Sequence, residues 1–179
     1  MKRSFKILNV KGISIEVNTS WIFAFVLMTY SIASGYLPNV SEDSGVVLRW
    51  GLGALMVILL FSSVVLHELA HSLVSIRQGI PVKRITVFIF GGIAEIEKEP
   101  EKPGDELKIA IAGPVLSFVL FLFLLGCTFL MPLLRASQIV LIPLAYLSSA
   151  NLILSLFNLI PAFPLDGGRI LRALIWKFS

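Results

Sequence analysis

Residues 46–76 read VVLRWGLGALMVILLFSSVVLHELAHSLVSI, and this stretch decides how the chain can fold. Between Arg49 and Glu68 it contains no Lys, Arg, Asp or Glu. As a helix, about 30 residues would reach roughly 45 Å, enough to cross a bilayer with a tilt or to emerge from it. The stretch therefore predicts a transmembrane helix that carries ionisable residues within the membrane.

Three other apolar stretches, residues 21–36, 107–130 and 137–160, are predicted to span a membrane. Hydrophobic residues make up 56% of the chain, whereas apolar residues make up about 45–50% of a soluble domain. The mean hydropathy of the chain is +0.90. We predict a turn over residues 38–44, an end to the last span at Pro161 and Pro164, and a new helix from residue 168. The expected fold is a mainly α polytopic membrane protein with about four complete transmembrane helices plus the start of a fifth.

Small β-strands are expected outside the spans. Residues 5–17 alternate apolar and polar side chains around Lys11-Gly12, which predicts a hairpin. Residues 85–90 and 93–96 also have the composition of strands and are separated by Gly91 and Gly92.

The positions of Lys and Arg indicate the orientation. Four lie in the N-terminal segment, six in the 77–108 loop and three after residue 168, against only Arg49 and Arg135 on the other side. By the positive-inside rule, we expect a multi-pass protein of the cell membrane with the N-terminus and the 77–108 loop in the cytoplasm. The basic residues do not form one polar face, so no nucleic acid partner is expected.

Residues 67–71 read HELAH and fit the metal-binding pattern H-E-x-x-H. His67 and His71 are four residues apart, so on a helix both imidazoles share one face and can reach one metal ion. Glu68, next to the first histidine, can act as a general base toward water. The alternative is a buried polar cluster that holds helices together, although ionisable groups are costly at such a position.

A catalytic zinc site needs a third protein ligand. Nine of the eleven acidic residues lie in the hairpin, the turn or the 77–108 loop, which leaves Glu68 and Asp166. The single cysteine, Cys127, is expected near the outer end of its span, whereas Asp166 follows the cytoplasmic end of the last span at a depth compatible with His67. Asp166 is therefore the candidate ligand, with a turn or N-cap role in Asp-Gly-Gly as the alternative.

Residues 67–71 (HELAH) and 158–169 (NLIPAFPLDGGR) together resemble the two signature motifs of the site-2 protease family of intramembrane zinc proteases. Residues 90–92 (FGG) and 112–114 (AGP) also resemble features of this family. The resemblance extends over roughly residues 60–172 and is close to archaeal and bacterial members.

This resemblance implies a function and a site. It implies hydrolysis of peptide bonds in membrane-anchored protein substrates, with one Zn2+ per chain bound by His67, His71 and Asp166. Glu68 would be the general base and later the proton donor. Asn158 would lie beside the metal and stabilise the oxyanion or hold the substrate carbonyl; its alternative role is a hydrogen bond between helices.

Three points are left open by the sequence. Gly91 and Gly92 belong either to strands that accept an unwound substrate as an added strand or to a tight turn. Family members often carry an asparagine where Ser117 stands here, so the role of this position is undefined. The chain ends about 12 residues into the fifth helix, so the single core domain expected over 1–179 is either truncated or a naturally small member.

Two functions from other classes compete with proteolysis. A zinc transporter would need a path of ligands across the membrane, and the sequence offers one cluster near one side. An inactive family member acting as a binding scaffold would not require Glu68, which is present.

Overall fold

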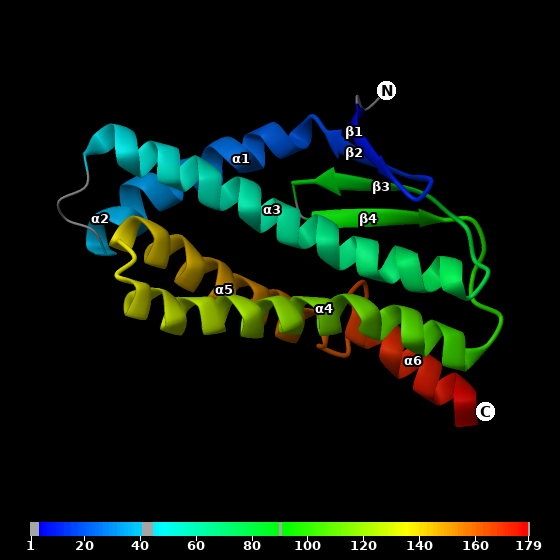
Figure 1. Ribbon diagram of the computed structural model, residues 1–179. Helices are drawn as coiled ribbons and strands as arrows, with labels where there is room; N and C mark the ends of the chain where they lie inside the picture. Colours follow the sequence, from blue (N-terminus) through cyan, green and yellow to red (C-terminus); the bar gives the residue numbers. More distant parts are fainter. Residues whose placement is uncertain (1–3, 41–44, 90, 179) are drawn as a thin grey trace.

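The computed structural model describes residues 4–40, 45–89 and 91–178 of the chain (Figure 1). Within these residues, four helices are long and apolar enough to cross a membrane, which confirms the predicted fold class. They cover Ser20–Asn39, Val46–Arg77, Pro103–Leu134 and Gln138–Asn158.

The first span is a composite helix, and the others are nearly continuous. The first span consists of α1 (Ser20–Ser31), a π-helical turn η1 (Ile32–Tyr36) and α2 (Leu37–Val40). The second span is α3 (Val46–Arg77), and the third is α4 (Pro103–Leu130) with a 3-10 turn η2 (Met131–Leu134). The fourth is α5 (Gln138–Asn158), and α6 (Asp166–Phe178) follows it.

Several predicted boundaries are wrong by a few residues. The turn predicted over 38–44 is helical up to Val40, because proline is tolerated in the first turn of a helix; residues 41–44 lie outside the described residues. α4 begins at Pro103, because proline suits a first helical position and Asp105 and Glu106 favour a helix N-terminus. α5 ends at Asn158, two residues before the predicted end, and α6 begins at Asp166, two residues before the predicted start.

The strands form one four-stranded sheet in the order β1-β2-β3-β4. β1 (Ser4–Val10) and β2 (Ile13–Asn18) form the predicted hairpin, with Lys11 and Gly12 at positive φ in its turn. β3 (Val82–Phe88) pairs in parallel with β2, and β4 (Gly91–Ile96) pairs antiparallel with β3. The strand predicted over 85–90 therefore starts earlier, and Phe90 lies outside the described residues. Gly91 and Gly92 lie in β4, not between the strands.

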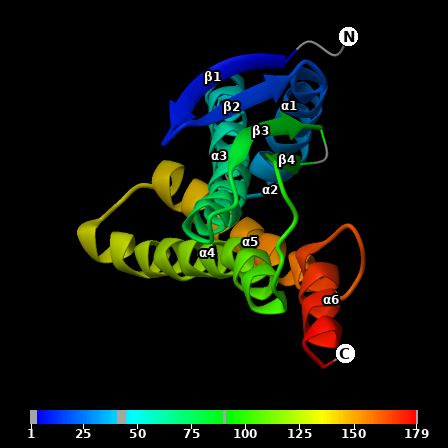
Figure 2. The ribbon, with the colours of Figure 1, turned by 90° about the vertical axis from the view of Figure 1, so that its right-hand side faces the viewer.

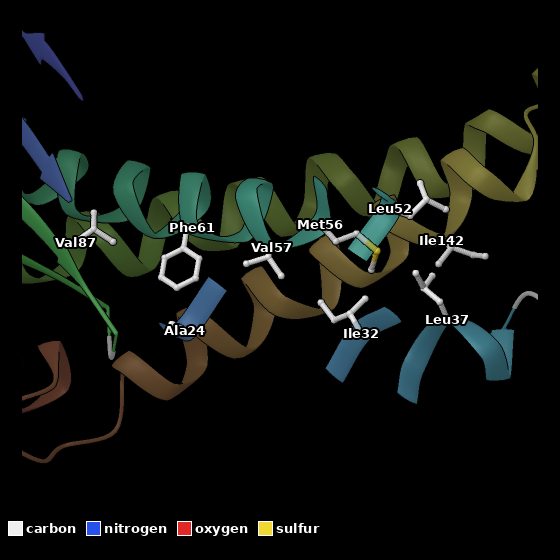
Figure 3. Packing of buried hydrophobic residues seen from close by; sticks show 9 residues of the cluster. All are labelled: Ala24, Ile32, Leu37, Leu52, Met56, Val57, Phe61, Val87 and Ile142. Carbon is white, nitrogen blue, oxygen red and sulfur yellow. The ribbon is translucent and has the colours of Figure 1, made fainter. Parts of the chain in front are cut away.

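The sheet and α4 lie on opposite sides of α3 (Figures 1 and 2). Ile13, Val82 and Ile85 of the sheet are buried and pack with Leu69 of α3. A second cluster joins α1, α3 and α5 along the spans (Figure 3). α3 is thus held from both sides, and its half nearest the sheet carries residues 67–71.

Candidate metal centre

Three buried side chains bring one ligand atom each to a single point. His67 Nε2 lies 3.1 Å from His71 Nε2 and 3.1 Å from Asp166 Oδ2, and His71 Nε2 lies 3.2 Å from the same oxygen. The exposed fractions of the three residues are 2%, 3% and 8%. The carboxylate comes from the first turn of α6, 99 and 95 positions after the two histidines. The structure therefore brings the three predicted ligands together.

The spacing of these atoms fits a small tetrahedral ion. Zinc binds nitrogen and carboxylate oxygen at about 2.0–2.2 Å, so two ligand atoms of a tetrahedral site are about 3.3 Å apart. The three separations of 3.1, 3.1 and 3.2 Å are close to that value. Two imidazoles and one carboxylate are also a donor set typical of catalytic zinc. The residues present fit a zinc ion.

Both histidines are oriented by α4. His71 Nδ1 donates a hydrogen bond to the carbonyl oxygen of Ile109 at 2.7 Å, which leaves Nε2 with its lone pair toward the other ligand atoms. His67 Nδ1 lies 2.9 Å from the hydroxyl oxygen of Ser117, which is fully buried. Ser117, whose role the sequence left open, thus contacts a candidate ligand directly.

Gly113 lets α4 approach the two histidines. A Cβ atom at this position would lie 2.5 Å from Nε2 of His67 and 2.6 Å from Cε1 of His71. Carbon and nitrogen atoms in ordinary contact are 3.4 Å or more apart. Only glycine at this position leaves room for both imidazoles.

The Asp-Gly-Gly segment places Asp166 against the end of α5. A Cβ atom on Gly167 would collide with the carbonyls of Leu159 and Ile160, and one on Gly168 would meet Ala162 at 2.8 Å. Oδ2 of Asp166 then faces Nε2 of both histidines, the position from which an ionised carboxylate could bind the same metal ion.

A cavity of about 1070 Å³ opens in front of these atoms. Its lining includes the other predicted site residues Glu68, Asn158, Gly91 and Gly92, as well as Arg169. Asn158 donates its amide N–H to Leu154 of its own helix at 2.9 Å while it lines the cavity. Every predicted site residue therefore faces one cavity.

β4 passes close to Glu68. A Cβ atom on Gly92 would lie 2.5 Å from Cγ of Glu68 and 3.2 Å from its Cδ. Gly91 has a φ of +136°, a conformation that favours glycine. Glycine is thus needed at position 92 to leave room for Glu68, and it suits the backbone conformation at position 91. Neither the substrate-strand nor the tight-turn interpretation of the sequence included these reasons.

Sequence reasoning missed the groups that surround the ligands. The Ile109 carbonyl leaves no trace in the sequence, because every residue has one. Gly113 did carry a signal in the AGP segment, but its contact with both imidazoles could not be inferred. Among the described residues, Cys127 is not in the group of possible metal ligands, in agreement with the argument from depth.

Known proteins match the chain across its length. The sequence matches Peptidase family M50 over residues 55–139 and 133–179. It is 41% identical over 181 residues to sll0528 of Synechocystis sp., which covers 100% of this chain and 46% of that protein. It is 40% identical over 179 residues to zinc metalloprotease MJ0392 of Methanocaldococcus jannaschii, which covers 99% of this chain and 47% of that one.

A solved structure agrees with these matches. The site-2 protease from Methanocaldococcus jannaschii has a TM-score of 0.65 to this chain at 37% identity, over 98% of this chain and 73% of that chain. The chain spans about half the length of the curated relatives it matches. With both signature segments inside the matched residues, the chain belongs to peptidase family M50, the site-2 proteases.

Proposed function

We propose that this chain is the catalytic core of an intramembrane zinc metalloprotease that hydrolyses a peptide bond in a membrane-anchored protein. The observation that carries the proposal is the triangle of ligand atoms from His67, His71 and Asp166, buried and with edges of 3.1–3.2 Å. Glu68 is not one of the three ligands, and it lines the cavity in front of them. This is the arrangement that hydrolysis by a zinc enzyme requires.

The proposed roles follow from position and chemistry. His67, His71 and Asp166 hold the zinc, which supplies Lewis-acid polarisation of the scissile carbonyl and a more acidic water. Glu68 takes a proton from the attacking water and later gives it to the leaving amine. Asn158 turns its amide from the Leu154 carbonyl toward the substrate carbonyl oxygen, where charge develops.

The substrate is expected to bind along β4. β4 is the last strand in the sheet order, and Gly91, Gly92 and three further residues of this strand line the cavity. An unwound substrate segment could pair with its free edge, which would satisfy backbone groups exposed by unwinding in a membrane. The small size of Gly92 keeps that edge close to Glu68.

The proposed enzyme is a multi-pass protein with its site toward the cytoplasmic side. The N-terminal hairpin and the 77–108 segment form one sheet, so both belong on the same side of the membrane. They also carry most of the basic residues, which the positive-inside rule assigns to the cytoplasm. Water for hydrolysis would enter the cavity from that side.

The test compares zinc content and cleavage of a single-span substrate reconstituted with the purified chain in vesicles. Wild type is expected to hold one zinc and cleave, Glu68→Ala to hold zinc without cleaving, and Asp166→Asn to lose both. Asp105→Asn, which removes an acid paired with Lys108 on the surface of α4, serves as the matched control. Zinc-loaded wild type that cleaves no membrane-anchored substrate would overturn the protease assignment. Full zinc affinity in Asp166→Asn would exclude Asp166 as a ligand.

A further inference from the structure

Glu106 is a buried acid outside the proposed machinery. It lies in the first turn of α4 and is 1% exposed. Arg172 of α6 donates to its Oε1 from Nε at 2.9 Å and also from Nη2. A buried carboxylate is costly unless it is paired, so this contact between two helices is specific.

The pair joins α6, which carries Asp166, to α4, which supports both histidines of α3. Glu106 precedes Ile109 by one turn of α4 and Gly113 by two turns, so the three residues lie along one face. All three are buried. Arg172 lies six residues after Asp166 in α6. One face of α4 thus contacts His71 through the Ile109 carbonyl and α6 through Glu106.

Asp166 needs such an external constraint. Within the described residues, the polar contacts of its side chain are only those with Nε2 of the two histidines. The two residues that follow it, Gly167 and Gly168, are the weakest helix formers after proline. Close packing of Gly167 and Gly168 on residues 159–162 fixes the start of α6. The direction of the helix, and with it the position of the Asp166 carboxylate, depends on contacts further along α6.

We propose that Glu106 and Arg172 are a positioning pair that fixes α6 against α4 and so holds Asp166 at the metal. The inference rests on the proposed metal site. Glu106 is buried, whereas the side chain of Arg172 is 46% exposed. Removing Arg172 would leave a buried carboxylate without its counter-charge, so the contact between the two helices depends on both residues. His67, His71 and Asp166 would then all be positioned by α4: through Ser117, through the Ile109 carbonyl, and through Glu106 with Arg172.

The test measures zinc affinity by competition with a chelator on the full chain in detergent, for Glu106→Gln, Arg172→Gln and the double variant. Each single variant is expected to bind zinc up to about 10-fold more weakly, the lower end of the range for groups that contact a metal ligand directly, because the pair acts on Asp166 only through α6. The double variant should be no weaker than the worse single one, because the two residues act as a unit. The visible spectrum of the cobalt-substituted protein should change in the same variants.

Two controls match the charge removed. Asp105→Asn removes the neighbouring acid of α4, whose partner Lys108 lies on the same helix. Lys177→Gln removes an exposed base of α6. Both are expected to keep wild-type zinc affinity. Arg172→Lys keeps the charge but not the two-nitrogen contact, so it should fold normally and bind zinc with intermediate affinity.

The outcomes separate this inference from the proposed function. Wild type that binds no zinc rejects the metal site itself. Wild type that binds zinc, with Glu106→Gln and Arg172→Lys binding it equally well, overturns the positioning role alone. Lower melting temperatures of the metal-free variants at unchanged zinc affinity would likewise assign the pair a purely structural role.

Discussion

Gly113→Ala gives the most direct test of the geometry at the metal centre. The added methyl carbon would lie 2.5 Å from Nε2 of His67, where ordinary contact begins at 3.4 Å. One of the two must therefore move by about 0.9 Å. The imidazoles have little freedom to do so, because Ser117 and the Ile109 carbonyl hold their other nitrogens from the same helix.

The displacement is large compared with what a metal site tolerates. Ligand distances in functional sites stay within about 0.2 Å of their usual values. We therefore expect zinc affinity to fall by about 100-fold or more, equivalent to about 2.7 kcal/mol. The fold itself should survive, because the gain in helix propensity of up to about 1 kcal/mol offsets part of an overpacking cost of about 1–3 kcal/mol.

The assay is zinc affinity by chelator competition, with thermal unfolding of the metal-free protein measured in parallel. Gly126→Ala is the matched control, since it lies on α4 and a Cβ there would meet nothing within 4 Å. Gly113→Ala should lose zinc and Gly126→Ala should not. Equal zinc affinity in both variants would refute the close packing of α4 against the histidines.

Three further changes probe other contacts of the same region. Ser117→Ala removes the hydroxyl 2.9 Å from His67 Nδ1 and should weaken zinc binding about 10-fold; an unchanged dissociation constant would contradict this. Gly92→Ala places a carbon 2.5 Å from Glu68 Cγ, so cleavage should fall at least about 10-fold with zinc content unchanged, and loss of zinc would argue against the assigned geometry. Asn151→Ala removes the hydrogen bond from Nδ2 to Ser63, so the free energy of unfolding measured in mixed detergent should fall by about 1–2 kcal/mol. An unchanged free energy of unfolding would contradict this contact between α5 and α3.

The fold class could be predicted because membrane spans are determined locally. Each span needs about 20 apolar residues in a row, and this signal is read directly from the sequence. The predicted helix boundaries differ from the observed ones at Pro38 and Pro103, because proline is tolerated in the first turn of a helix. The pairing of β2 with β3 could not be predicted, because it joins segments about 70 residues apart and no periodicity encodes which strands become neighbours.

The ligand set could be predicted for a different reason. Residues 67–71 form a motif whose spacing already places two imidazoles on one face. Asp166 could be predicted as the third ligand because few other acidic residues lie near the spans. The positioning groups were not predictable: Ile109 contributes a backbone carbonyl, and Glu106 was grouped with the polar 77–108 loop although it is buried in α4.

The separation of the ligands along the chain has a consequence for biogenesis. The two histidines emerge from the ribosome 95 or more residues before Asp166, so a growing chain offers a metal only two of its three ligands. Metal affinity depends on the complete set of ligands being held in place. Zinc loading would then wait until Asp166 has been synthesised and α6 has packed against α4, and a chain that has inserted only its first two spans would lack a complete metal centre.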